Sequence, residues 1–320
     1  MRAVHIETLD GPAAVRVVDI PEPEPAPDQL LIDVHAAGVT FPEVLQSRGK
    51  YQLQPPLPFV PGAEVSGVVR AAPEGSGFTV GDRVAGFPGL GGFAETVAAD
   101  PRAVFRLPER LSFEQGASLP MNVLTSHFAL VRRGGLRPGE VVLVHGAAGG
   151  VGTASVQLAK ALGARVIAVV SSDAKAAVAR EAGADDVLRP EGFKDAVREL
   201  PGGVDIVVDP VGGDRFTDSL RCLRPEGRLL VIGFTAGEIP TVKVNRLLLN
   251  NVSVAGVGWG AFWLPRPEYL REQWDDVLPH VQAGRLDPVI GARFALDDAA
   301  KALVSLDERA ALGKVVLRVR

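Results

Sequence analysis

The sequence lacks the features on which disulfide-stabilised, thiolate-metal and membrane-spanning proteins depend. Its 320 residues include one cysteine, Cys222, so no disulfide forms within the chain and no thiolate cluster holds a metal. The longest apolar runs, such as residues 166–170, are far shorter than the ~20 residues that a spanning helix needs. The amino terminus carries a charge at once and then alternates, which is typical of a strand and not of a signal peptide. We therefore expect a soluble, cytoplasmic protein.

An excess of charge of one sign is also missing. The chain has 34 lysine and arginine residues against 38 aspartate and glutamate residues, which gives a net charge of −4, and no basic run is visible. A mildly acidic surface repels nucleic acids and anionic membranes. We therefore expect no nucleic-acid partner and no membrane partner.

The composition that is present is that of a globular protein, with 47% hydrophobic and 22% charged residues. The length exceeds one ordinary core and favours two domains. Short alternating runs broken by proline and glycine occupy the first 108 residues, at 30–36, 65–70 and 93–97, and a turn at 81–84 feeds another strand. This pattern predicts an antiparallel, partly closed β domain.

The pattern changes from about residue 120, where apolar strands begin to alternate with helices. The strands are expected at 141–145, 165–170, 186–188, 204–208, 228–232 and 252–257, and the helices at 151–162, 173–182 and 193–200. Six such strands predict an α/β fold with a doubly wound parallel sheet. Helices at 269–283 and 297–306 and a strand at 313–319 are expected to rejoin the β domain, with Asp297 or Asp298 as a helix cap.

A glycine-rich turn joins the first of these strands to the first helix, where residues 143–152 read Leu-Val-His-Gly-Ala-Ala-Gly-Gly-Val-Gly. Gly146 permits a sharp exit from the strand, and Gly149 and Gly150 let a pyrophosphate approach the backbone. Gly152 lets the helix pack closely, and the helix start offers N–H groups to the phosphates. A turn that needs glycine only for its geometry is the alternative. The predicted dinucleotide contacts are Gly146, Ala147, Gly149, Gly150, Val151 and Gly152.

The segment after the second parallel strand bears on which dinucleotide is bound. NAD sites usually place an acid there to hold the ribose 2′-hydroxyl. Here Ser171, Ser172 and Lys175 suit a 2′-phosphate, which favours NADPH. Asp173 is interpreted as the cap of the next helix. A solvated Lys175 with no role in binding is the alternative.

Six motifs, in order and spacing, resemble the medium-chain dehydrogenase/reductase superfamily in its zinc-independent quinone oxidoreductase (zeta-crystallin-like) branch. They lie at 38–51, 58–64, 81–84, 146–152, 209–213 and 313–317. The resemblance covers essentially the whole chain. It implies a GroES-like, partly open β-barrel domain built from residues 1–120 and 259–320, and a Rossmann domain of six parallel strands at 121–258.

The positions of the zinc ligands in related alcohol dehydrogenases hold other residues here. Thr40 stands where those enzymes have a cysteine, and Ala63 replaces histidine in the triplet Gly62-Ala63-Glu64. The five histidines show no close pairing, whereas zinc needs three or four ligands. We therefore expect no zinc. Glu64 is interpreted as a buried acid that forms a salt bridge or anchors its loop.

Quinones and α,β-unsaturated carbonyls accept hydride from a nicotinamide without a metal, because the developing oxyanion needs only hydrogen-bond donors. The resemblance points to Thr40 and Tyr51 as catalytic residues, to Asn122 and Thr125 beside the nicotinamide, and to Asn245 against the cofactor. Thr40 departs from the asparagine usual in quinone reductases. Tyr51 is either a proton donor to the reduced oxygen or a packing aromatic of the cleft wall.

Aromatic side chains supply the predicted substrate pocket, which contains Phe41, Trp259 and Phe262, whereas Trp263 belongs either there or to domain packing. Cys222 follows a helical pattern and is interpreted as inert core. The last parallel strand, between Val252 and Val257, would be an aggregation-prone edge if left open. Pairing with a second copy, as in the family, predicts a homodimer.

The leading interpretation is therefore an NADPH-dependent, zinc-independent reductase that transfers hydride to a quinone. A reductase of enones or 2-alkenals is the alternative within the same chemistry. An alternative of another class is a non-catalytic NADPH-binding or crystallin-like protein.

Overall fold

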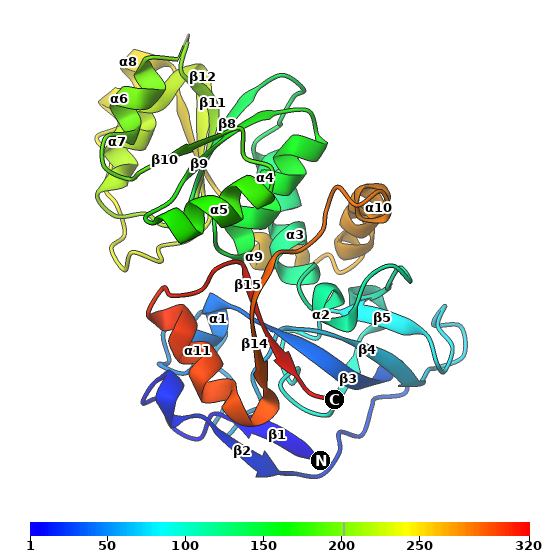
Figure 1. The fold of residues 1–320 in the computed structure, drawn as a ribbon. Coiled ribbons are helices and arrows are strands. Elements are labelled where there is room, and N and C mark those ends of the chain that lie inside the picture. The colour runs from blue at the N-terminus through cyan, green and yellow to red at the C-terminus, as the bar shows by residue number, and fades with distance from the viewer. Residues whose placement is uncertain (201) are drawn as a thin grey trace. The chain divides into compact units, whose positions relative to one another are not determined.

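The computed structural model of the protein describes residues 1–200 and 202–320 (Figure 1). These residues form two compact units. The first comprises Met1–Met121, Pro267–Asp275 and Pro288–Arg320, and the second comprises Asn122–Arg266 and Asp276–Asp287. The boundaries expected from the sequence lie after residues 120 and 258. In the structure, residues 259–266 and 276–287 group with the second unit.

The first unit is built on a seven-stranded sheet to which both ends of the chain contribute (Figure 1). The strand order is β14-β15-β3-β4-β5-β7, and β6 also pairs with β3. Only β14 and β15 run parallel; the other pairs are antiparallel. The strands are β3 (Leu30–Val39), β4 (Glu64–Ala71), β5 (Arg83–Gly86), β6 (Thr96–Ala99), β7 (Val104–Arg106), β14 (Ile290–Ala295) and β15 (Lys314–Arg318). A separate antiparallel pair joins β1 (Arg2–His5) to β2 (Arg16–Asp19).

Pairing of β15 with β3, which sets Val315 opposite Val39, confirms that the tail rejoins the amino-terminal β domain. Three short helices complete this unit, namely α1 (Phe41–Gln46), α2 (Phe113–Gly116) and α11 (Ala299–Asp307).

The strand expected at 93–97 begins only at Thr96, because the Phe93 backbone bonds to Val4 and Pro61 in other segments. The prediction of a side-chain cap for α11 is wrong. Asp298 stands at its N-cap, but its carboxylate bonds to the Lys301 ammonium at 2.7 Å.

The second unit confirms the predicted doubly wound sheet. Six parallel strands lie in the order β10-β9-β8-β11-β12-β13, so the order reverses between β8 and β11. The strands are β8 (Val141–His145), β9 (Arg165–Val169), β10 (Asp186–Leu188), β11 (Val204–Asp209), β12 (Leu223–Val231) and β13 (Ser253–Gly256). Their inner side chains form a core with Phe193, Phe216 and Leu220.

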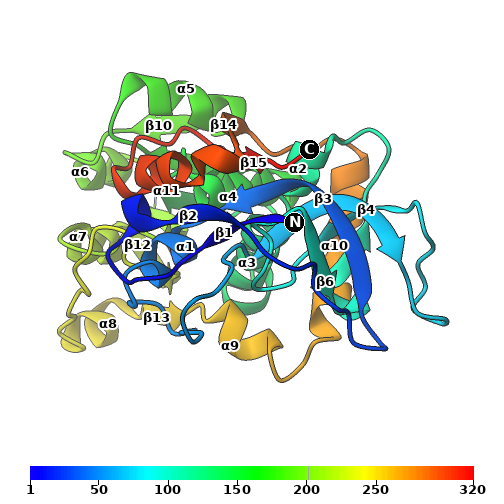
Figure 2. The same ribbon diagram turned by 90° about the horizontal axis from the view of Figure 1, so that it is seen from below.

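Crossover helices join these strands. Helix α4 packs with α5, and α6 packs with α7, as right-handed crossovers on the two faces of a sheet require. Their bounds are α4 (Gly150–Ala161), α5 (Asp173–Glu181), α6 (Phe193–Arg198) and α7 (Arg215–Cys222). Helix α8 (Asn245–Asn250), strand β13 and helix α9 (Trp259–Trp263) follow one another along one edge of the unit (Figure 2). These two helices were not expected from the sequence.

Two further helices cross the boundaries of the units. Helix α3 (Pro120–His127) continues into a π-helical turn at Phe128–Arg133, and α10 (Tyr269–Gln282) contains Pro279. No helix within the described residues combines the length and apolarity that crossing a bilayer requires.

Candidate active site

The glycine turn lies between β8 and α4, where the strand order reverses. Gly146 has a φ of +58°, a left-handed conformation that favours glycine, so the chain leaves β8 sharply. A Cβ on Gly152 would lie 2.1 Å from Gly146 O and 2.7 Å from Ala147 Cα. Because both atoms belong to the backbone, they do not yield as a flexible side chain would. Only glycine at position 152 lets α4 begin against the end of β8.

The middle of the turn is open on one side and supported on the other. A Cβ on Gly149 would meet only Gly146 O, at 3.5 Å, so space remains beside this residue. A Cβ on Gly150 would lie 2.6 Å from Asn122 Nδ2, so the Asn122 amide packs on the turn. Gly149 is the N-cap of α4, and its position supplies no side chain to satisfy the first N–H groups of the helix. The first N–H groups of α4 can therefore bind an anion.

Helix α3 carries two of the predicted cofactor residues, Asn122 and Thr125, both of which are buried. The Ser126 and Ser155 hydroxyl oxygens lie 2.9 Å apart and join α3 to α4. Ser126 Oγ also donates to the carbonyl of Val151 at 3.4 Å. The structure therefore brings α3 and the glycine turn together.

The predicted 2′-phosphate corner lies where β9 ends and α5 begins. Ser172 is the N-cap of α5, and its hydroxyl accepts the Lys175 N–H at 3.3 Å. The Lys175 ammonium donates to Ser171 Oγ at 3.3 Å. The interpretation of Asp173 as the cap is wrong, because its fully exposed carboxylate forms an ion pair with Arg189 instead. Two cations, Lys175 and Arg189, therefore lie in this corner, and Arg189 pairs with Asp173.

A second loop at the same sheet edge packs against the glycine turn. A Cβ on Gly146 would lie 3.2 Å from Val211 Cγ2. The loop is held by Asp209, whose Oδ1 accepts the N–H groups of Val211 and Gly212, both at 2.9 Å. Burial raises the pKa of Asp209. This role was not assigned from the sequence, although Asp209 directly follows a predicted buried strand.

Asn245, another predicted cofactor residue, begins α8. None of the side chains of α8 is buried. The structure therefore places Asn245 at the surface of the second unit, and its contact with a cofactor stays a prediction.

Thr40 and Glu43 form the centre of the catalytic corner of the first unit. Thr40 is the N-cap of α1, and Glu43 Oε2 accepts both its N–H, at 2.8 Å, and its hydroxyl. The other carboxylate oxygen of Glu43 accepts the Ala63 N–H at 3.0 Å. Burial raises the pKa of Glu43, although the hydrogen bond from Thr40 and the charge of Lys314 oppose this. Glu43 was missed, yet the spacing Thr40-x-x-Glu43 is that of a capping box.

Tyr51 belongs to the same unit. Burial of its phenol and the charge of Glu43 raise the pKa of Tyr51, so the hydroxyl keeps its proton at neutral pH. A neutral phenol is the form that donates a hydrogen bond to an oxyanion. A half-buried, neutral phenol is compatible with both roles expected for Tyr51, that of a proton donor and that of a packing aromatic.

Glu64 forms the salt bridge expected for it. One carboxylate oxygen contacts the ammonium of Lys314, and the other accepts the Met121 N–H at 2.8 Å. Both side chains are almost fully buried, at 0% and 4% exposure. Glu64 thus ties β4 to β15 and to the first turn of α3. Within residues 1–200 and 202–320, no three histidine, cysteine or acidic side chains are grouped as metal ligands.

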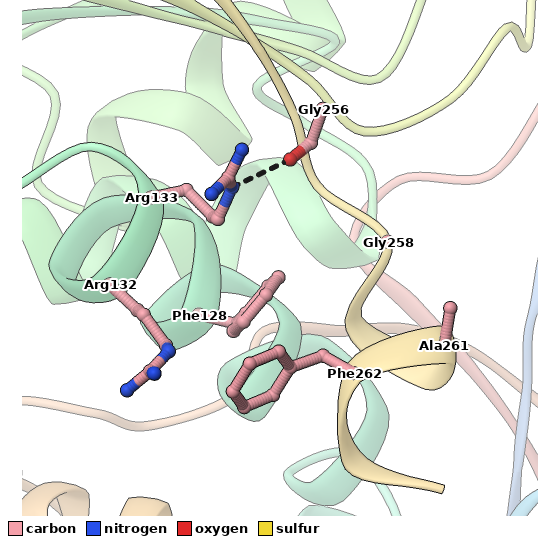
Figure 3. A pocket seen from close by; sticks show the side chains of 7 residues that line it. All are labelled: Phe128, Arg132, Arg133, Gly256, Gly258, Ala261 and Phe262. Carbon is pink, nitrogen blue, oxygen red and sulfur yellow. Dashed lines mark hydrogen bonds between the residues drawn. The ribbon is translucent and has the colours of Figure 1, made fainter. Parts of the chain in front are cut away.

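The predicted aromatic residues come from both units, Phe41 from the first and Trp259 and Phe262 from the second. Phe262 lines an open pocket of about 630 Å³ together with Phe128, Arg132 and Arg133 (Figure 3). The rings of Phe262 and Phe128 lie 5.1 Å apart, and the Arg132 guanidinium lies 4.5 Å from the Phe262 ring. This pocket therefore joins aromatic surface to positive charge, whereas the sequence suggested an apolar cleft.

The other predicted aromatics do not line that pocket. Trp259 is buried, with its ring 5.8 Å from that of Trp263, which favours a packing role for this pair. Phe41 begins α1 in the first unit and packs against the core of that unit.

Two other reactive side chains lie inside the second unit. Burial and the charge of Arg215 lower the pKa of His145 to about 3, so its imidazole is neutral. Its Nε2 lies 2.7 Å from Ser219 Oγ. Burial raises the pKa of Cys222 to about 12, which fits the interpretation of an inert core thiol. Neither group is suited to proton transfer near neutral pH.

A chain that folds into one unit with a parallel sheet and a glycine turn at its switch point, and into a second, β-rich unit made from both chain ends, belongs to the class of two-domain, dinucleotide-binding oxidoreductases. Comparison with known families agrees with this class. Residues 26–109 match the alcohol dehydrogenase GroES-like domain, and residues 150–283 match the zinc-binding dehydrogenase family.

Individual relatives cover the whole chain. The bovine (Bos taurus) quinone oxidoreductase-like protein 2 is 38% identical over 100% of this chain and 93% of its own length. A crystal structure of a probable oxidoreductase from Mycobacterium abscessus is 44% identical, with a TM-score of 0.91 over 100% and 99% of the two chains. The quinone oxidoreductase from Thermus thermophilus, solved alone and in complex with NADPH, is 35% identical, with a TM-score of 0.87 over 100% of both chains.

The chain belongs to the quinone oxidoreductase-like family of the medium-chain dehydrogenase/reductase superfamily. The predicted combination of a GroES-like domain with a six-stranded Rossmann domain is confirmed.

Proposed function

We propose that this protein is an NADPH-dependent, zinc-independent reductase that transfers hydride to a quinone. The observation that carries the proposal is the glycine turn at the switch point, with an open backbone at Gly149 and a helix N-terminus behind it. The complex of the Thermus thermophilus quinone oxidoreductase with NADPH supports the choice of cofactor.

The residues of the turn fit a dinucleotide. A pyrophosphate would approach Gly149, where a Cβ would find only one neighbour within 4 Å, and would meet the first N–H groups of α4. The amide of Asn122 and the hydroxyl of Thr125 would orient the nicotinamide. When bound, the nicotinamide supplies a hydride. Tyr51 would donate a hydrogen bond to the oxygen on which negative charge develops. The Thr40 hydroxyl, which donates to Glu43 in this structure, would turn toward that oxygen to do the same.

The substrate class is tested by comparing kcat/KM for a benzoquinone with that for a 2-alkenal, under identical NADPH concentrations. The proposal predicts a clear preference for the quinone. A preference for the alkenal would make the protein an enone reductase with the same residues. Tight NADPH binding without turnover of either acceptor would support the non-catalytic alternative.

Replacing Lys175 by methionine is expected to lower the ratio of NADPH to NADH affinity by about tenfold. A hydrogen bond to a charged group contributes ~1.5–3 kcal/mol, and only NADPH carries the 2′-phosphate that Lys175 would meet. Fluorescence titration with each cofactor measures this ratio. Lys160→Met is the matched control, because Lys160 pairs with Asp185 at 2.7 Å and is half-exposed like Lys175. If Lys175→Met lowered the affinities for NADPH and NADH equally, Lys175 would not bind the 2′-phosphate.

We also propose a homodimer formed through β13. This strand is an end strand of the sheet, and within the described residues its outer edge pairs with no other strand. Leu248 and Leu249 in the preceding α8 are about three-quarters exposed, at 76% and 75%. A second copy that pairs along β13 would complete the hydrogen bonds of the edge and cover this apolar surface.

Sedimentation at low protein concentration tests the dimer. The wild-type protein is expected to sediment as a dimer, and the double variant Leu248→Asp, Leu249→Asp as a monomer, because two charges would be buried. Val80→Asp is the control, since Val80 is 71% exposed in the first unit and should leave the dimer intact. A monomeric wild type would refute the proposal.

A further inference from the structure

The pocket around Phe262 belongs to the second unit alone, and elements other than the glycine turn build it. Its lining comes from the π-helical turn after α3, from the end of β13 and from α9, whereas the glycine turn lies between β8 and α4. Its volume of about 630 Å³ falls within the range of small-molecule sites, which is roughly 300–1,000 Å³. The pocket is thus large enough for a ligand of its own.

A π-helical turn positions the side chains of one wall of this pocket. Residues Phe128–Arg133 form the turn, which continues α3. Such turns are rare, and those that interrupt a helix are frequently found at functional sites. Figure 3 shows Phe128 and Arg133 pointing from the turn toward the chain between Gly256 and Phe262. The irregular helix is therefore found where it lines the pocket.

Two glycines keep the other wall free of side chains. Gly256 ends β13 and Gly258 precedes α9, and neither has the positive φ that would require glycine. A Cβ on Gly256 would meet no atom within 4 Å, and one on Gly258 would meet only Ala261 Cβ, at 3.8 Å. Neither backbone conformation nor packing therefore explains these glycines. A glycine in a strand with open space beside it fits the close approach of a ligand or of another backbone.

Neutral groups hold two arginines in place around the pocket. The Arg133 Nε–H donates to the Gly256 carbonyl at 2.8 Å, and the Arg266 Nη1–H donates to the Phe262 carbonyl at 3.0 Å. Within residues 1–200 and 202–320, neither guanidinium forms an ion pair, and no acidic residue lines the pocket. Because a carbonyl carries no net charge, both positive charges stay available to an anion. The Nη groups of Arg133 suit a carboxylate, which matches a guanidinium with paired hydrogen bonds.

The rest of the pocket surface is aromatic. Phe128 is buried, and its ring lies 5.1 Å from that of Phe262. The guanidiniums of Arg132 and Arg266 lie 4.5 Å and 4.7 Å from the centre of the Phe262 ring. A planar guanidinium stacks on aromatic faces, so this surface suits a further ring. A single inorganic ion would fill little of the volume and would leave the aromatic surface uncovered.

We propose that this pocket binds a small aromatic carboxylate, independently of the dinucleotide. The ring of the ligand would lie against Phe128, Phe262 and the Arg132 guanidinium. Its carboxylate would accept hydrogen bonds from the Nη groups of Arg133. The open space beside Gly256 admits the ligand.

Isothermal titration calorimetry of the full chain with 2-naphthoate tests the site, with and without saturating NADPH. We expect saturable binding of one naphthoate per chain, with the same dissociation constant in both conditions. The amide 2-naphthamide has the same rings without the charge, and cyclohexanecarboxylate has the charge without an aromatic ring. Both should bind at least about tenfold more weakly, because each lacks one of the two kinds of contact.

Two variants locate the bound naphthoate. Arg133→Gln keeps a donor for the Gly256 carbonyl but removes the charge, and it should weaken binding about tenfold. Gly256→Val places a β-branched side chain in the open space of a strand position, and it should abolish binding. Arg198→Gln is the control, because Arg198 is an exposed arginine of α6 in the same unit that does not line the pocket. Every variant should keep the NADPH dissociation constant of the wild type, which shows that each folds.

Several results would overturn the proposal. They are the absence of saturable naphthoate binding, equal affinity for 2-naphthoate and 2-naphthamide, and unchanged naphthoate affinity in both pocket variants. Displacement of naphthoate by NADPH would place the ligand in the dinucleotide site instead. An affinity that falls as the protein concentration is raised would show that a second copy of the chain covers the pocket. None of these results depends on the reduction of a quinone, so the test is independent of the proposed function.

Discussion

Replacement of Gly152 by alanine is expected to weaken NADPH binding by about 100-fold. The added Cβ would stand 2.1 Å from Gly146 O, and the affected atom belongs to the turn that would hold the pyrophosphate. Forced overpacking costs ~1–3 kcal/mol, and each 1.4 kcal/mol corresponds to about a tenfold change in affinity. Because the clash involves backbone atoms, we expect the upper end of that range. Fluorescence titration measures the affinity, and thermal unfolding should show a lower Tm.

Gly149→Ala provides the matched comparison within the same turn. A Cβ at position 149 would have no close neighbour, since Gly146 O lies 3.5 Å away, and the residue has an ordinary extended conformation. Its Tm should equal that of the wild type, while its NADPH affinity should fall because the Cβ enters the space proposed for the phosphates. Unchanged NADPH affinity in both variants would contradict the assignment of the turn.

Lys314→Met is expected to lower the free energy of unfolding by about 3–5 kcal/mol, the largest effect on stability that we predict. The substitution leaves the Glu64 carboxylate in the core with the Met121 N–H as its remaining partner. An unpaired buried charge is far more costly than the loss of a surface pair. The effect is measured as the change in free energy of the first cooperative transition during unfolding by denaturant.

Two variants accompany this test. Lys301→Met removes an ion pair with Asp298, in which the lysine is 76% exposed, and should change stability by less than about 1 kcal/mol. Glu64→Gln added to Lys314→Met should restore much of the lost stability, because the buried charge is gone. If Lys314→Met and Lys301→Met lowered the free energy of unfolding by the same small amount, the buried Lys314–Glu64 pair would not stabilise the fold more than a surface pair does.

The elements that could be predicted from the sequence are those with a local signature. The six parallel strands are short apolar runs bounded by polar residues and turns, and the glycine turn combines its spacing with a strand before and a helix after. Helix α9 and strand β14 carry no such signature. Helix α9 has only five residues, too few for a clear helical period. Strand β14 has six residues, but glycine and arginine interrupt its apolar positions and none of its side chains is fully buried.

The contacts that organise the catalytic corner are long-range, which explains why the sequence did not reveal them. Glu43 meets Ala63 across 20 residues, and Lys314 meets Glu64 across 250 residues. The Thr40-x-x-Glu43 spacing was visible as a capping box but gives no information on burial. Glu64 was expected to form a salt bridge, but its partner Lys314 became identifiable only when β15 was seen to pair with β3.

Anaerobic mixing of the protein with NADPH and benzoquinone tests the proposed reductase activity. We expect rapid loss of NADPH absorbance that depends on the protein, with formation of one hydroquinone for each NADPH consumed. Gly152→Ala should lose this activity at limiting NADPH concentration. If the protein binds NADPH but the NADPH absorbance stays constant in the presence of the quinone, the protein is not a quinone reductase.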